Sequence, residues 1–165
     1  IPDNPAFILA VLFSFAQIFR ISIILHNLTE LFIYGGLATL FVPSLSLYST
    51  TILLILISIY DAIAVWKTKH MIKLAKFQSK VKTFAGLVIP YKKRTAILGG
   101  GDIGFPLIFT GVVYNSIGLP ALIIPVFTAL ALLVLLWQGE KNKFYPAMPF
   151  ITAGCFIGYL IAIFI

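Results

Sequence analysis

The sequence predicts an all-α protein, a polytopic transmembrane helix bundle with about six spanning helices. Of its 165 residues, 61% are hydrophobic and only 10% are charged, and the mean hydropathy is +1.07. Soluble domains are nearer one half apolar and one quarter charged. Lipid suits such a surface, because a soluble domain of this size cannot bury so many large apolar side chains. A tightly buried soluble helical bundle is the alternative.

Six windows are long or apolar enough to be spanning helices, each of which needs about 20 residues. In chain order they are 5–25, 27–42, 48–66, 101–114, 119–137 and 146–165. In the last window, Gly154 and Gly158 form a small-xxx-small pattern that favours close helix packing. The same role is expected of Gly35, Gly36 and Gly111.

The basic residues are concentrated in one predicted loop, at 67–97. Nine of the twelve Lys and Arg residues lie between Lys67 and Arg94. If this loop is cytoplasmic, the other basic residues also fall at cytoplasmic ends, as the positive-inside rule requires. The net charge of +7 is therefore read as an orientation signal and not as a nucleic-acid site. Residues 67–82 mix basic and apolar side chains, which predicts an amphipathic helix at the membrane surface.

Acidic residues divide into two groups. Three of the five are expected in or near loops: Asp3, Glu30 and Glu140. The other two, Asp61 and Asp102, fall in or at the start of predicted spans. A carboxylate at the centre of a spanning helix costs at least about 2.5–3.5 kcal/mol, so acids in the membrane are candidates for function.

Asp61 and Asp102 are expected at similar depths. Asp61 precedes Lys67 by six residues, and Asp102 follows Arg94 by eight. Both approach the membrane from the side of the same loop, so adjacent antiparallel helices would bring them together. Two like charges in a low dielectric share one proton, as in an aspartic protease dyad. Spacing alone leaves a second interpretation open, in which they are separate packing or proton-relay acids of a transporter.

Other catalytic chemistries find little support. No Ser–His or Cys–His pair lies at a comparable depth, and no cluster is suited to zinc. His26 is expected in a loop and His70 at the membrane surface, so neither is assigned to a metal. We therefore expect neither a metal nor an organic cofactor.

Three glycines, Gly99, Gly100 and Gly101, directly precede Asp102. Glycine allows close backbone approach and φ values that a Cβ forbids. Another chain could therefore pass within hydrogen-bonding distance beside the acid. Close helix packing is the alternative, and a phosphate cradle fits poorly because an acid stands where phosphate would bind.

Three motifs carry a resemblance to a known family. They are Tyr60-Asp61 within ISIYDAIAVW, Gly99-Gly100-Gly101-Asp102, and Pro146-Ala147-Met148-Pro149. In their order they resemble the Tyr-Asp, Gly-x-Gly-Asp and Pro-Ala-Leu elements of the presenilin and signal-peptide-peptidase family of intramembrane aspartyl proteases. The likeness is greatest to its archaeal presenilin homologues, with Met148 in place of leucine.

This resemblance implies one transmembrane catalytic domain over 1–165, equivalent to helices four to nine of a nine-helix fold, with the first three helices outside this chain. It implies that Asp61 and Asp102 are catalytic. It also implies seven substrate-binding residues: Tyr60, Gly99, Gly100, Gly101, Pro146, Ala147 and Met148.

The implied activity is hydrolysis of peptide bonds in transmembrane-helix substrates, in the plasma membrane of an archaeon, with loop 67–97 cytoplasmic. The implied partners are protein substrates and the lipid bilayer, with no nucleic acid and with a homo-oligomer possible. An unwound substrate would need new backbone partners in lipid, and 83–97 and 146–148 are the candidate edges. A proton- or cation-coupled transporter or leak channel using the same two acids is the alternative, and a structural or chaperone-like membrane subunit is a third.

Overall fold

The computed structural model describes residues 8–9, 11–15, 23–67, 85–91, 94–138 and 145–165. Its longer helices are α2 (Ile23–Phe41), α3 (Leu47–Trp66), α5 (Gly100–Ile117), α6 (Ile123–Gln138) and α7 (Met148–Phe164). Two short 3-10 helices are η1 (Val42–Ser44) and η2 (Leu119–Leu122). Two strands precede α5, β1 (Gly86–Tyr91) and β2 (Arg94–Gly99). The predicted helix bundle is confirmed, and a small hairpin is added to it.

The helices have the length and composition of membrane spans. Within the described residues, three segments are long and apolar enough to cross a bilayer: Ile23–Ser44, Leu47–Trp66 and Leu119–Trp137. Met148–Phe164 is apolar and shorter. These segments match four of the six predicted windows, and α5 contains a fifth. Window 5–25 is described only in part, and its last residues belong to α2. The protein is an integral membrane protein.

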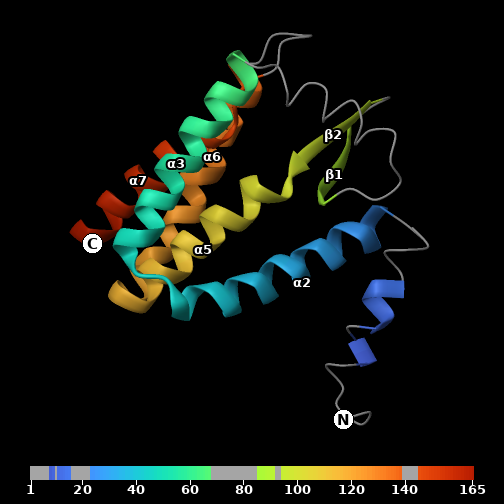
Figure 1. Cartoon of the computed structure of the whole chain (residues 1–165), viewed down its shortest axis with the longest axis horizontal. Coiled ribbons are helices and arrows are strands. Elements are labelled where there is room, and N and C mark those ends of the chain that lie inside the picture. The colour runs from blue at the N-terminus through green and yellow to red at the C-terminus, as the bar shows by residue number, and fades with distance from the viewer. Residues whose placement is uncertain (1–7, 10, 16–22, 68–84, 92–93, 139–144) are drawn as a thin grey trace.

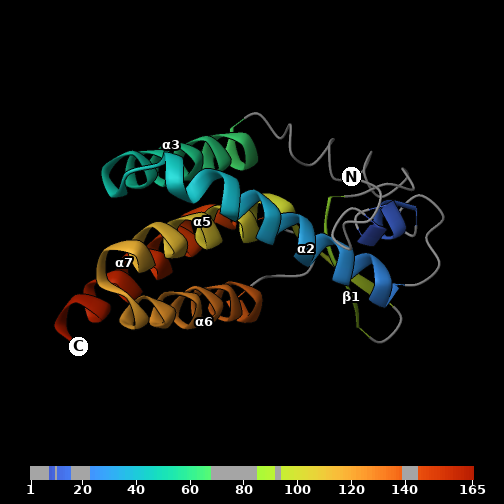
Figure 2. The ribbon, with the colours of Figure 1, turned by 90° about the horizontal axis from the view of Figure 1, so that it is seen from below.

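Helix α5 lies at the centre of the bundle (Figure 1). Seen from below, α5 and α7 lie between α3 and α6, and α2 crosses beside α5 (Figure 2). Phe109 and Val113 of α5 are completely buried. The ring of Phe109 meets those of Phe156 and Tyr159 edge-on, each at a centroid distance of 6.0 Å. This apolar core fixes α5 against α7 and so fixes whatever α5 carries at its first turn.

Helices α6 and α7 make the most extensive helix–helix contact among the described elements. A Cβ added to Gly154 would lie 2.8 Å from the carbonyl oxygen of Phe127, and one added to Gly158 would lie 2.8 Å from Cα of Ile124. Backbone atoms cannot give way cheaply, so only glycine permits this approach. The predicted small-xxx-small contact is confirmed.

The other glycines expected to pack helices behave differently from one another. A Cβ at Gly111 would lie 2.6 Å from Cγ2 of Val42, so close packing is confirmed there. Around Gly35 and Gly36 no atom of the described residues comes within 4 Å of an added Cβ. The expected close packing is therefore not found for these two among the described residues.

The hairpin leads directly into α5. Its strands are antiparallel, with pairs from Gly86↔Gly99 to Tyr91↔Arg94. The N–H of Gly100 donates to the carbonyl oxygen of Ala85 at 3.2 Å, which extends the pairing to the base of the hairpin. Gly99 has extended backbone (ψ 145°) and is both the last strand residue and the N-cap of α5.

Part of the predicted loop at 67–97 is thus ordered as strands. The predicted amphipathic helix at 67–82 lies outside the described residues, apart from Lys67, the C-cap of α3. The hairpin starts at Gly86, whose φ of 152° favours glycine. The hairpin therefore begins and ends on a glycine, and its second strand leads into the first turn of α5.

Candidate active site

Asp61 lies on α3, five residues before the helix ends at Trp66. Only 6% of its surface is exposed. Its Oδ2 accepts a hydrogen bond of 3.0 Å from the backbone N–H of Met148, the first residue of α7. The C-terminal part of a helix is an unfavourable place for an anion. The favourable partner of this carboxyl is therefore the N-terminus of a second helix.

The Pro-Ala-Met-Pro sequence explains why α7 offers its N–H groups there. Pro146 and Pro149 have no N–H, so Ala147 and Met148 carry the backbone donors of this turn. Both of these N–H groups face Asp61. The first N–H groups of a helix have no partner within it, and here the carboxyl supplies one. The predicted site residues 146–148 and Asp61 are brought together.

Asp102 is the third residue of α5, after the N-cap Gly99. Its carboxyl turns back toward the backbone N–H of Gly99, and a Cβ at Gly99 would lie 3.3 Å from its Oδ2. This is the geometry of a capping box, in which an acid at the third helix position accepts a hydrogen bond from the backbone N–H of the N-cap residue. Asp102 is half-buried, and its charge interacts with that of Asp61.

The three glycines before Asp102 have unequal surroundings. A Cβ at Gly100 would lie 2.5 Å from the hydroxyl oxygen of Tyr34 on α2. At Gly101 the nearest contact is an ordinary 3.4 Å to the ring of Phe105. A larger residue at position 100 would therefore displace the hydroxyl of Tyr34, and the close neighbour of Gly100 is a side chain of this chain.

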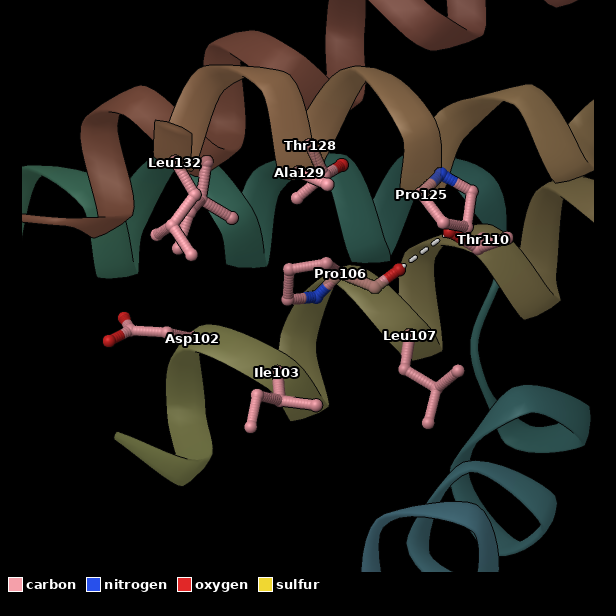
Figure 3. Close-up of a pocket in the computed structure, with 10 residues that line it drawn as sticks. Asp102, Ile103, Pro106, Leu107, Thr110, Pro125, Thr128, Ala129 and Leu132 are labelled. Atoms are coloured by element: carbon pink, nitrogen blue, oxygen red, sulfur yellow. Dashed lines mark hydrogen bonds between the residues drawn. The ribbon is translucent and has the colours of Figure 1, made fainter. Parts of the chain in front are cut away.

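A cavity of about 230 Å³ opens beside Asp102. Figure 3 shows it between α5, which supplies Ile103, Pro106, Leu107 and Thr110, and α6, which supplies Pro125, Thr128, Ala129 and Leu132. The hydroxyls of Thr110 and Thr128 donate to carbonyl oxygens of their own helices, each at 2.8 Å. Because these hydroxyls are satisfied, the cavity is apolar except for the carboxyl of Asp102 at one end.

Comparison with known families decides the assignment. The sequence model of a family described as signal-peptide peptidase, presenilin aspartyl protease matches residues 5–101, more than half of the chain. The chain belongs to this family of aspartyl proteases. The matched range contains Tyr60, Asp61 and the three glycines, and it ends one residue before Asp102. No curated protein matches the chain.

For two buried polar residues of this family member, the location predicted from the sequence is wrong. Glu30 and His26, both expected in or near a loop, lie within α2 and are 2% and 8% exposed. Those expectations are wrong, because the hairpin and α5 cover one face of α2. Asp3, Glu140 and His70 lie outside the described residues.

The face of α2 that is covered carries a recognisable pattern. Residues 26, 30 and 34 follow one another at intervals of four, so they lie on one side of the helix. The hydroxyl of Tyr34 donates to Glu30 Oε2 at 2.5 Å. A polar stripe at this spacing in an apolar window was the signal in the sequence that would have revealed the buried face.

Tyr60, the other half of the Tyr-Asp motif in this family, is separated from the two acids. It is 68% exposed, whereas the adjacent Asp61 is buried, so the two side chains point to different sides of α3. Among the described residues, no group of three His, Cys, Asp or Glu side chains is arranged to hold a metal ion.

Proposed function

We propose that the protein is an intramembrane aspartyl endopeptidase that hydrolyses peptide bonds of transmembrane-helix substrates. The observation that carries the proposal is a pair of interacting carboxyls, Asp61 and Asp102, on neighbouring helices of a membrane-embedded bundle. Each is placed at a helix N-terminus, where backbone N–H groups face it. Membership in an aspartyl protease family supports the same chemistry.

In the proposed mechanism, the two carboxyls share one proton and hold a water between them. The ionised carboxyl takes a proton from this water as it attacks the scissile carbonyl carbon. The protonated carboxyl donates its proton to the carbonyl oxygen, which gives a tetrahedral diol. When the C–N bond breaks, a carboxyl returns a proton to the leaving amine, so no covalent enzyme intermediate forms.

The substrate backbone needs partners once it is unwound, because lipid offers none. Each strand of the hairpin has one edge that pairs with no other described strand. A substrate segment added to an edge of β2 would be led toward Asp102, because β2 runs into α5. Pro106 adds an acceptor nearby, since it lacks the N–H that would bond the Asp102 carbonyl oxygen within the helix.

The cavity beside Asp102 is proposed to receive one apolar side chain of the substrate, next to the scissile bond. A cavity of about 150 Å³ binds benzene, and pockets for drug-sized ligands start at about 300 Å³. The cavity here, of about 230 Å³, lies between these sizes. It suits a single leucine or phenylalanine side chain.

The test uses the full-length protein in liposomes with a single-span protein substrate. Asp61→Asn and Asp102→Asn keep the side-chain shape, and each is expected to lower the cleavage rate by at least about 10³-fold, since each removes a proton-transfer group. Thr39→Val is the control, because this exposed hydroxyl bonds only the carbonyl of Gly36 among the described residues. Cleavage that survives both Asn substitutions would refute the proposal.

A further inference from the structure

We propose that Tyr34 and Glu30 of α2 are positioning residues that set the first turn of α5 and so the direction of the Asp102 carboxyl. This inference rests on the proposed function, since it assigns a consequence for catalysis to residues that touch no reacting atom. Neither residue belongs to the motifs that carry the family resemblance.

Tyr34 packs along the first turn of α5. Its hydroxyl occupies the space where a Cβ of Gly100 would lie, at 2.5 Å, and its ring comes within 4.0 Å of a Cβ on Gly104. Residues four apart lie on the same side of a helix. The tyrosine therefore spans about one helical turn of α5 from the α2 side.

Asp102 lies on the opposite side of this turn. Each residue advances about 100° around a helix, so Asp102 is about 200° from Gly100. Tyr34 thus packs against the side of this turn that is opposite the Asp102 carboxyl. Displacement of the ring would let the turn roll toward α2 and would carry Asp102 away from Asp61.

Glu30 fixes the tyrosine in turn. The hydroxyl of Tyr34 donates to Glu30 Oε2 at 2.5 Å, and both side chains are buried in a membrane-spanning helix. Acids in this environment are rare and costly, and they mark function by default. Apolar side chains in place of Tyr34 and Glu30 would fill the same space at lower cost. They would lack the hydrogen bond that fixes the Tyr34 ring at one position along α5.

The same face of α2 also holds the start of the hairpin. His26 lies one turn before Glu30, and its Nε2 donates to the carbonyl oxygen of Gly86 at 3.1 Å. Gly86 pairs with Gly99 across the hairpin. Helix α2 therefore contacts Gly86 at the start of the hairpin through His26, and Gly100 at the start of α5 through Tyr34.

A double-mutant cycle tests the contact in the full-length protein in liposomes. Gly100→Ala places a methyl against the Tyr34 hydroxyl and is expected to lower kcat about 100-fold, a loss typical of a 1 Å misplacement. Tyr34→Phe removes the hydroxyl and its bond to Glu30, and is expected to lower kcat about tenfold with KM unchanged. In the double variant, kcat should exceed that of Gly100→Ala alone, because the hydroxyl that clashes is gone.

Matched controls separate positioning from general damage. Gly104→Ala makes the same change one turn later, where the tyrosine ring is 4.0 Å away, and should leave kcat within about twofold. Thr29→Val removes another buried hydroxyl of α2, which bonds the carbonyl of Leu25 on its own helix, and should also leave kcat unchanged. Glu30→Gln retains an acceptor for Tyr34 and should keep more activity than Glu30→Leu.

Amide hydrogen exchange supplies a readout that does not depend on cleavage. Tyr34→Phe should speed exchange at residues 99–102 and leave exchange in α6 unchanged. Equal exchange in the variant and the parent, or a Gly100→Ala defect in kcat that Tyr34→Phe fails to relieve, would overturn the inference. Failure of the proposed function has a different signature, since the parent and its Asp61→Asn and Asp102→Asn variants would then cleave substrate equally.

Discussion

The two acids of the site are held in opposite ways. Asp61 is buried near the end of its own helix and accepts its hydrogen bond from α7, 87 residues further along the chain. Asp102 is half-buried in the first turn of its own helix and turns to the N–H of Gly99, three residues before it. One carboxyl is positioned by tertiary packing and the other by local capping.

This difference shows where each acid is vulnerable. Asp61 stays in place only while α7 is docked on α3, and α7 in turn is packed against α6 through Gly154 and Gly158. Asp102 stays in place while the first turn of α5 keeps its shape, which depends on Gly99, on Gly100 and on Tyr34 beside Gly100. Changes in the α6–α7 contact should therefore reach Asp61 first, and changes near the hairpin should reach Asp102 first.

The largest effect is expected from Gly154→Ala. Its Cβ would lie 2.8 Å from Phe127 O and 2.9 Å from Thr128 Cα, so the backbones must separate. Unfolding free energy should fall by about 3 kcal/mol, the upper end for overpacking, as measured by thermal unfolding in detergent. Amide exchange should rise at Met148 and stay constant at Gly99.

The control for this substitution is Gly35→Ala. No atom of the described residues lies within 4 Å of a Cβ there, and alanine favours a helix interior by about 1 kcal/mol over glycine in soluble hosts. Gly35→Ala should therefore be neutral or stabilising. A loss of stability equal to that of Gly154→Ala would contradict the assignment of the two faces.

A smaller effect should distinguish the two acids themselves. Asp61→Glu adds a methylene at a buried position and should cost about 2 kcal/mol. Asp102→Glu places glutamate at the third helix position, where it is the preferred capping-box acid, and should change stability by less than about 0.5 kcal/mol. Both unfolding free energies can be measured in the same detergent, and equal losses would show that local capping does not hold Asp102.

The smallest effect should appear on the Asp102 side alone. Ala129→Phe should fill the cavity between α5 and α6, which Asp102 lines and Asp61 does not. Cleavage of substrates with leucine or phenylalanine beside the scissile bond should fall about tenfold relative to those with alanine, within the range for one apolar side chain in a pocket. The ratio of kcat/KM for matched substrates measures this, and an unchanged ratio would remove the cavity from the proposed site.

Much of this architecture was predictable from local patterns. The apolar windows identified the helices because each span must satisfy its backbone within itself, and the small-xxx-small pattern identified the α6–α7 contact. The acids Asp61 and Asp102 stood out because their cost in lipid does not depend on tertiary detail.

The covered face of α2 was not predicted, for a physical reason. Glu30 and His26 lie near one end of the predicted window 27–42, where exposure to water and burial under another element look the same in sequence. The hairpin that covers them was expected as a loop, since lysines and a proline interrupt its apolar residues. The structure pairs β1 with β2 and packs β1 against α2, so that this segment covers part of α2.

Gly99 is both the last residue of β2 and the N-cap of α5, so no loop separates the hairpin from the helix that carries Asp102. A movement of β2 would therefore reach the first turn of α5 directly, through Gly99 and Gly100. A substrate segment that changes the shape of the hairpin would thereby also change the direction of the Asp102 carboxyl relative to the substrate's peptide bond. In the proposed protease, binding of the substrate and alignment of Asp102 would then be coupled.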